Sequence, residues 1–243
     1  MCPKYLEVGI EAVLKSSKVI MKYYNKKKPE INLDSKVEEI LREIIFSYFP
    51  EHNFDGEENG LTINNSNSIY TWYCDPISSS NNFKRNLPHF AVSLSLFENS
   101  EQILGIVYDP ACDEMFHALK GEGAFLNNVP IFPSQQNELK KSYFSCSMKK
   151  NSSEIVQICE QGASYKAFGS WALQFCYVAS GRLDFVYTQL KDIHGTFSGL
   201  FIAKEAGCKF FDGRTLDYDL NSSRVLVTNS EKILTDTKKL FFK

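Results

Sequence analysis

Helical and extended sequence patterns alternate along almost the whole chain, with no linker long enough to separate independent domains. Apolar residues recur at approximately helical spacing in residues 4–24, and at intervals of three and four residues in 35–49. A run rich in aromatic and β-branched residues marks a strand at 69–74, and the segments 89–97 and 103–108 resemble two paired strands. Helices and strands that alternate in this way bury their apolar faces against one another in layers. The sequence therefore predicts an α/β protein, more closely an α+β layered sandwich.

The 243 residues suit one compact unit, 1–243, with a substantial core. Within it we expect an N-terminal α+β half over 1–135 and a C-terminal α/β half over 136–243. Further elements are predicted in both halves: a hairpin over 114–126 followed by a turn at Asn127 and Asn128, helices over 170–181 and 195–206, and strands over 183–187 and 209–211.

Charge and cysteine content argue against several functional classes. A formal net charge of −2 gives no global field that would drive the chain onto nucleic acid or an acidic membrane. No apolar run reaches the roughly 18–20 residues of a membrane-spanning helix, and the early Glu7 argues against a secretory signal. The cysteines, 7 in number and without a C-x-x-C pair, indicate free thiols in a reducing cytosol. We expect a soluble cytoplasmic protein.

Three carboxylates occupy turns and the ends of predicted elements. Glu57 lies in a glycine-flanked turn, Asp75 ends a strand just before Pro76, and Asp34 opens the second helix. Carboxylates at such places can build an oxygen-lined magnesium site, because this cation takes hard ligands in octahedral geometry. Taken one by one, each has an ordinary alternative, such as a helix N-cap for Asp34 and a solvated turn residue for Glu57.

Several motifs, taken together and in order, resemble one known family. Residues 72–83, which read WYCDPISSSNNF, are similar to the inositol monophosphatase signature W-x-x-D-P-I-D-G-T-T-N-F. The turn at 56–58 resembles the family's G-E-E turn, and further similar motifs lie at 104–110, 121–127, 169–170, 178–184 and 203–207. The resemblance spans about residues 5–230. It implies alternating α-β-α-β-α layers and, by family analogy, a homodimer.

In this family, water hydrolyses phosphate monoesters with the help of two or three magnesium ions. The resemblance implies that Glu57, Asp75 and the backbone carbonyl of Ile77 hold the first ion, and all three are present. Asp34 and Ser80 match the aspartate and threonine that orient the attacking water, and a serine hydroxyl can serve as the threonine does. Carried over in this way, the catalytic residues are Asp34, Glu57 and Ser80, and the ligand is a phosphate monoester.

The second metal site departs from the family pattern. Ser78 replaces the second aspartate of D-P-I-D, and counting without gaps from Gly169 places Gly195 at the aspartate of a later W-D motif. A serine hydroxyl is neutral and glycine has no side-chain ligand, so the ion that stabilises the leaving-group oxygen loses two negative charges. We expect one weakly bound magnesium ion and no second. Asp192 would rescue the site only through a three-residue shift of register, which rotates the following helix face by about 300°.

The resemblance also places a substrate pocket. Gly169 and Ser170 match a glycine–serine motif beside the substrate, whereas Trp171 stands where the family has a small residue. An indole here either fills a pocket sized for a polyol or turns into the core. Thr188 replaces an inositol-contacting glutamate, and Ser79 replaces the glycine of D-G-T, a change that would crowd the approach of the backbone to phosphate.

Two functions follow from these departures. The first is a family-derived protein that keeps metal site one, lacks metal site two, hydrolyses phosphate monoesters slowly or not at all, and acts by binding or regulation. Some bacterial relatives give a precedent, since they act in transcription complexes independently of phosphatase activity; the regulatory protein partner here is unknown. The alternative is an active magnesium-dependent phosphomonoesterase with a second site rebuilt from Asp192, Glu58 or another acid. Its substrate would be an inositol phosphate, a sugar phosphate or a nucleotide 3′-phosphate.

Overall fold

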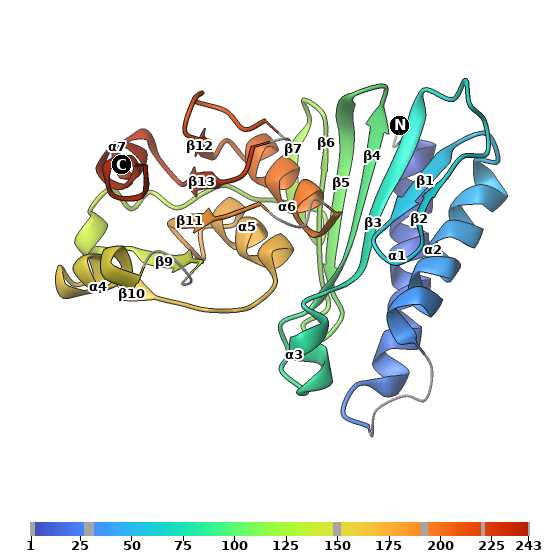
Figure 1. Ribbon diagram of the computed structural model, residues 1–243, viewed down its shortest axis with the longest axis horizontal. Helices are drawn as coiled ribbons and strands as arrows, with labels where there is room; N and C mark the ends of the chain where they lie inside the picture. Colours follow the sequence, from blue (N-terminus) through green and yellow to red (C-terminus); the bar gives the residue numbers. More distant parts are fainter. Residues whose placement is uncertain (1–2, 27–31, 148–151, 191–193, 220–221, 243) are drawn as a thin grey trace.

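The computed structural model describes residues 3–26, 32–147, 152–190, 194–219 and 222–242. In it, helices and sheets are stacked in alternating layers (Figure 1). Its helices are α1 (Lys4–Tyr23), α2 (Leu33–Tyr48), α3 (Ser80–Lys84), α4 (Ser152–Glu160), α5 (Trp171–Ala179), α6 (His194–Glu205) and α7 (Glu231–Phe241), with one short 3-10 helix at Leu139–Lys141.

The strands form two sheets. The larger, 8-stranded sheet has the order β2 (Gly60–Thr62), β1 (Asn53–Gly56), β3 (Tyr70–Ser78), β4 (Ala91–Glu98), β5 (Glu101–Asp109), β6 (Glu114–Leu119), β7 (Gly123–Leu126) and β8 (Val129–Pro130). The 5-stranded sheet has the order β10 (Ser164–Tyr165), β9 (Tyr143–Cys146), β11 (Phe185–Thr188), β13 (Val225–Thr228) and β12 (Lys209–Phe211).

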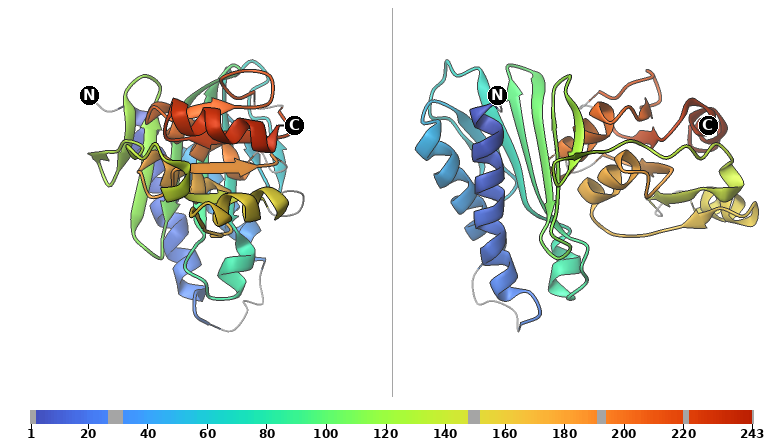
Figure 2. Two further views of the ribbon diagram at one scale, coloured as in Figure 1. Left: turned by 90° about the vertical axis from the view of Figure 1, so that its left-hand side faces the viewer. Right: turned by 180° about the vertical axis from the view of Figure 1, so that it is seen from behind.

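Three apolar cores lie between the layers, because alternate residues of each strand face opposite sides. Helices α1 and α2 cover one face of the larger sheet, where Trp72 and Cys74 of β3 are fully buried. Helices α5 and α6 lie between the two sheets, packed on residues such as Val107 of β5 and Val227 of β13. On the far side of the smaller sheet, α4 and α7 cover Leu226 (Figure 2). The candidate site belongs to the middle layer.

The fold class expected from the sequence is confirmed, and most differences concern element boundaries. The hairpin at 114–126 and the turn after it are present, with Asn127 and Asn128 both at positive φ. The second helix begins at Leu33 rather than at residue 35, and the strand expected at 69–74 runs on to Ser78. The strand expected at 183–187 begins only at Phe185.

Short or unpatterned elements were not predicted, namely β1, β2, α3, β8, the 3-10 helix, β9, α4, β10, β13 and α7. Each of the missed strands has only two to four residues, too few to show a period. The division of the chain at residue 135 stays a prediction, although the two sheets do fall within residues 53–130 and 143–228.

Two further observations bear on the expectations from composition. None of the helices in the described ranges has both the length and the hydrophobicity to span a bilayer. The six cysteines at described positions are free thiols, as the spacing predicted. An ion pair between Arg182, in the turn after α5, and Glu114 of β6 joins the two halves through two hydrogen bonds of 2.6 Å each.

Candidate functional site

The pairing of β1 with β3 brings Glu57 and Asp75 side by side. These strands are parallel, Gly56 pairs with Cys74, and the backbone N–H of Glu57 donates to the Cys74 carbonyl at 3.0 Å. Asp75 lies on the same face of β3 as Tyr73, whose ring packs on Phe197 of α6, and Glu57 lies beside this strand in an exposed turn. Burial raises the pKa of the Cys74 thiol, and the nearby carboxylates of Asp75, Glu38 and Glu57 raise it further. Anionic oxygen is therefore concentrated at this end of β3.

A β-bulge at the end of β3 arranges a third oxygen ligand. The register with β4 shifts between Asp75, opposite Ser93, and Ser78, opposite Ala91, so β3 carries one extra residue here. The Oδ1 atom of the buried Asp75 accepts the N–H of Ile77 at 3.0 Å. The chain thus turns around the Asp75 carboxylate, and the Ile77 carbonyl lies on this turn.

The donor set fits one magnesium ion. Glu57 and Asp75 supply carboxylate oxygens and Ile77 a carbonyl oxygen, which are the hard ligands that this cation takes, with water at the remaining positions. Among the described residues, no group of three or more histidine, cysteine, aspartate and glutamate side chains is arranged to hold a metal. Two carboxylates and one carbonyl are thus the oxygen donors that this end of β3 could offer to a cation.

Ser78, expected at the second metal site, makes a neutral contact instead. Its side chain is 5% exposed, and its hydroxyl lies 3.0 Å from the hydroxyl of Ser170 in a hydrogen bond. Ser170 is the N-cap of α5 and accepts the N–H of Leu173 at 3.3 Å. The pair joins the end of β3 to the start of α5 and adds no negative charge.

The other position of the second metal site is at the start of α6. Gly195 is the second residue of this helix and is buried; Asp192, the possible replacement, lies outside the described residues. The preceding His194 places Nε2 at 3.4 Å from Oδ1 of Asp55 on β1, and its ring lies 6.1 Å from that of Tyr73. Sequence reasoning missed this aspartate–histidine pair, because only the pairing of β1 with β3 places Asp55 beside Tyr73.

The two residues expected to orient water lie on neighbouring segments. Asp34 is the second residue of α2 and is half-buried; the N-cap is Asn32, so the N-cap interpretation of Asp34 is wrong. Burial raises the pKa of Asp34, the charge of Glu58 raises it further, and the charge of Lys84 at the end of α3 opposes this. Asp34 therefore lies within electrostatic reach of both the 56–59 turn and α3, the helix that Ser80 begins.

Ser79 occupies a backbone conformation that favours glycine. Its φ and ψ are 72° and 53°, in the left-handed region, and its carbonyl accepts the N–H groups of Asn82 and Phe83 in α3. For an L-residue with a side chain, this conformation costs about 1–2 kcal/mol of conformational free energy. The glycine of the D-G-T pattern therefore serves the turn itself, in addition to any approach of the backbone to phosphate.

Replacing Ser79 with glycine should stabilise the protein. Glycine relieves the left-handed strain, but it also gives the unfolded chain more conformational entropy, which opposes the gain. The free energy of unfolding should therefore rise by about 0.5–1 kcal/mol. For a chain of this size the melting temperature should rise by about 1–4 °C, measured by differential scanning calorimetry. Ser80→Gly, one residue later and inside α3, should instead lower it. A lower melting temperature for Ser79→Gly would contradict this account of the turn.

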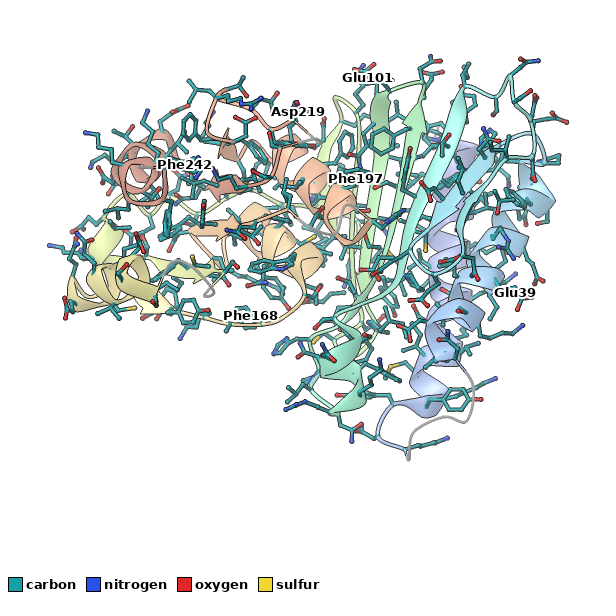
Figure 3. All side chains as sticks on the ribbon, viewed as in Figure 1. Glu39, Glu101, Phe168, Phe197, Asp219 and Phe242 are labelled. Carbon is teal, nitrogen blue, oxygen red and sulfur yellow. The ribbon has the colours of Figure 1, made fainter. Side chains whose placement is uncertain are left out.

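Gly169 packs directly against the turn that follows β3. It has φ of +94°, and a Cβ built on it would lie 2.5 Å from Nδ2 of Asn82 and 2.9 Å from Oγ of Ser79. The Asn82 amide donates to the carbonyls of Phe168 at 2.6 Å and His89 at 2.7 Å. Figure 3 labels Phe168 on the segment that leads into α5. Gly169 and Ser170 thus lie at the end of β3; their role beside a substrate stays a prediction.

The two remaining pocket residues take part in the middle layer. Trp171 is the first residue of α5; its ring is partly buried and packs against the core between the sheets. Thr188 is 1% exposed, and its hydroxyl donates to the carbonyl of Gln189 at 3.3 Å. Trp171 therefore turns at least in part toward the core, and Thr188 is almost completely buried.

A cavity of about 680 Å³ lies further along the same face of the larger sheet, between the β4–β5 turn and α6. Its walls include Tyr73 and the aromatic ring of Phe197, which is labelled in Figure 3. Two lysines at this cavity are engaged: Lys120 pairs with Glu101 at 2.6 Å, and Lys204 pairs with a neighbouring aspartate at 2.7 Å. Among the described residues that line it, both lysines are thus paired with carboxylates, and the candidate site stays at the end of β3.

Comparison with known proteins shows which family this chain resembles in sequence and in structure. The sequence profile of the inositol monophosphatase family matches residues 4–240. Inositol monophosphatase 3 of Solanum lycopersicum is 33% identical over 93% of this chain and 92% of its own length. The Nus factor SuhB of Haemophilus influenzae is 30% identical over 90% of this chain and 86% of its own. The solved inositol monophosphatase of Anabaena superposes with a TM-score of 0.86 at 28% identity, covering 98% of this chain and 94% of that one.

Proposed function

The chain belongs to the inositol monophosphatase family, and on that premise we propose that it keeps the family's first magnesium site and has lost the second. In this proposal the protein binds one magnesium ion and a phosphate monoester, hydrolyses the ester slowly or not at all, and acts by binding or regulation.

One observation carries the proposal. Where the family's second ion takes a carboxylate, Ser78 presents a buried neutral hydroxyl that is already hydrogen-bonded to Ser170. Removing one group that stabilises transition-state charge commonly costs about 10²–10³ in rate. Here Ser78 and Gly195 both lack the negative charge, so two such contributions are missing from the leaving-group side.

The remaining residues suggest what the site does. Glu57, Asp75 and the Ile77 carbonyl would hold the ion, which when bound supplies positive charge to a phosphoryl oxygen. Asp34 would accept a proton from the attacking water, and the Ser80 hydroxyl would orient that water. Trp171 at the start of α5 would narrow the space beside the phosphate.

The role outside catalysis is proposed from the relatives. A protein 30% identical to this chain bears the name of a Nus factor rather than that of a phosphatase. We extend this to a regulatory role of this chain with a protein partner, in a cytoplasmic compartment and as a homodimer. The alternative, an active phosphomonoesterase with a rebuilt second site, depends on Asp192 or another acid joining Asp75.

Counting bound magnesium tests the proposal. Isothermal titration calorimetry of the wild type with Mg²⁺, in the presence of inorganic phosphate, should give one ion per chain. Glu57→Gln should weaken this binding, because it removes one of only two carboxylates in the donor set. Two ions per chain at saturation would overturn the loss of the second site and favour the active phosphomonoesterase.

A further inference from the structure

A fully buried carboxylate lies directly behind the turn that carries Glu57. Glu38 of α2 is 0% exposed. Its Oε2 accepts the N–H of Glu58 at 2.8 Å, and its Oε1 accepts the backbone N–H and the side-chain amide of Asn59 at 3.1 and 2.7 Å. Its neighbour Glu39 lies on the outer side of the same helix (Figure 3). Hydrogen bonds to an ionised acceptor are about twice as strong as neutral ones, so these three bonds hold the turn firmly.

The glycine of the G-E-E turn is explained by the same carboxylate. A Cβ built on Gly56 would lie 2.1–2.3 Å from the carboxylate atoms of Glu38. No real side chain tolerates such a contact, so glycine at this position lets the buried carboxylate approach the backbone. The turn is therefore built around Glu38.

Both peptide groups that flank the Cα atom of Glu57 are fixed by hydrogen bonds. On one side, the N–H of Glu57 donates to the Cys74 carbonyl of β3 at 3.0 Å. On the other, the N–H of Glu58, which belongs to the same peptide group as the Glu57 carbonyl, donates to Glu38. Since φ and ψ are the only soft backbone torsions of a residue, fixing both neighbouring peptide groups fixes the direction of its Cα–Cβ bond.

We infer that Glu38 is a positioning residue, whose buried carboxylate aims Glu57 at the magnesium ion that Glu57 and Asp75 share. The inference rests on the proposed first metal site. It extends that site by one residue which touches neither the ion nor the substrate. Groups that orient metal ligands commonly change metal affinity by about 10–100-fold when they are mutated.

The test is the magnesium affinity of Glu38→Gln. The glutamine has the same length, but it presents an amide NH₂ to N–H donors in place of one oxygen, so the turn should loosen. We expect calorimetry to show Mg²⁺ binding weaker by about 10–100-fold. Residue-resolved hydrogen exchange should show faster exchange at the amides of Glu58 and Asn59, with the central strand β4 as protected as before.

Glu43→Gln is the matched control, since Glu43 lies on the same helix, is exposed and loses the same charge. It should leave both the Mg²⁺ affinity and the exchange of the turn unchanged. Asn59→Ala supplies a second variant at an exposed position, in case Glu38→Gln does not fold; it removes the 2.7 Å bond and should weaken Mg²⁺ binding by a few-fold.

Glu57→Gln separates the two ways in which the inference can fail. If Glu57→Gln leaves the Mg²⁺ affinity unchanged, the first metal site itself is wrong and the role of Glu38 falls with it. If Glu57→Gln weakens binding but neither Glu38→Gln nor Asn59→Ala does, the metal site stands. Glu38 then only stabilises the fold, and the positioning role is overturned.

Discussion

The double variant Ser78→Asp, Gly195→Asp should hydrolyse phosphate monoesters at least about 10²–10³ times faster than the wild type, because it restores charge at the leaving-group side. The measurement is the release of inorganic phosphate from a panel of inositol, sugar and nucleotide monophosphates across a magnesium series. In the variant, the Ser78 position would supply a carboxylate next to Asp75, and an aspartate in the first turn of α6 also suits the helix dipole.

The single variants and a charge control sharpen this result. Each single substitution restores one ligand of two, so neither should reach the rate of the pair. Ser100→Asp with Ser153→Asp adds the same net charge at two exposed positions and should leave the rate unchanged.

Two results would contradict the proposal that the second magnesium site has been lost. The first is a wild type that already turns over at about 1–10 s⁻¹, the ordinary range of enzymes. The second is a double variant as slow as the wild type. Adding Trp171→Ala to a silent double variant would then show whether the indole blocks the pocket.

The parts of the fold that were predictable are those whose information is local. The β4–β5 hairpin and the turn at Asn127 and Asn128 follow from alternation of apolar residues and from residues that tolerate positive φ. Strands β1 and β2 have four and three residues; β1 depends on pairing with the longer β3, and β2 depends on pairing with β1. Helix α3 begins from the left-handed Ser79, which no local preference indicates.

The residues of the candidate site also fall into those that local sequence motifs predict and those that depend on the tertiary fold. Glu57, Ser79, Gly169 and Ser170 are brought to one end of β3, whereas Thr188 lies on β11 of the other sheet, and the chemical roles of all of them stay predictions. Glu38 was missed because its role depends on where the 56–59 turn lies in space. A sequence signal did exist, since Glu38 follows Asp34 by four residues and such pairs share one face of a helix. The Asp55–His194 proximity had no such signal, because it needs the pairing of β1 with β3 and the position of α6.

Asp34→Asn, made in the double variant, should lower turnover by about 10²–10⁴, the usual contribution of a general base. The amide keeps the shape of the carboxyl but cannot accept the proton of the attacking water. Glu39→Gln, on the exposed side of the same helix, should leave turnover unchanged. A turnover within a few-fold of the parent would remove Asp34 from the mechanism.

The pH profile of the double variant gives a second, independent test of Asp34. Burial and the nearby Glu58 favour its protonated form, which raises its pKa above the ordinary value of 3.8. A base works only when deprotonated, so the rate should fall as the pH drops through this raised pKa. Glu58→Gln removes a cause of the rise and should move the acid limb to lower pH. Lys84→Met removes the opposing positive charge and should move it to higher pH. Shifts in the same direction, or no shift in either variant, would assign the acid limb to a group other than Asp34.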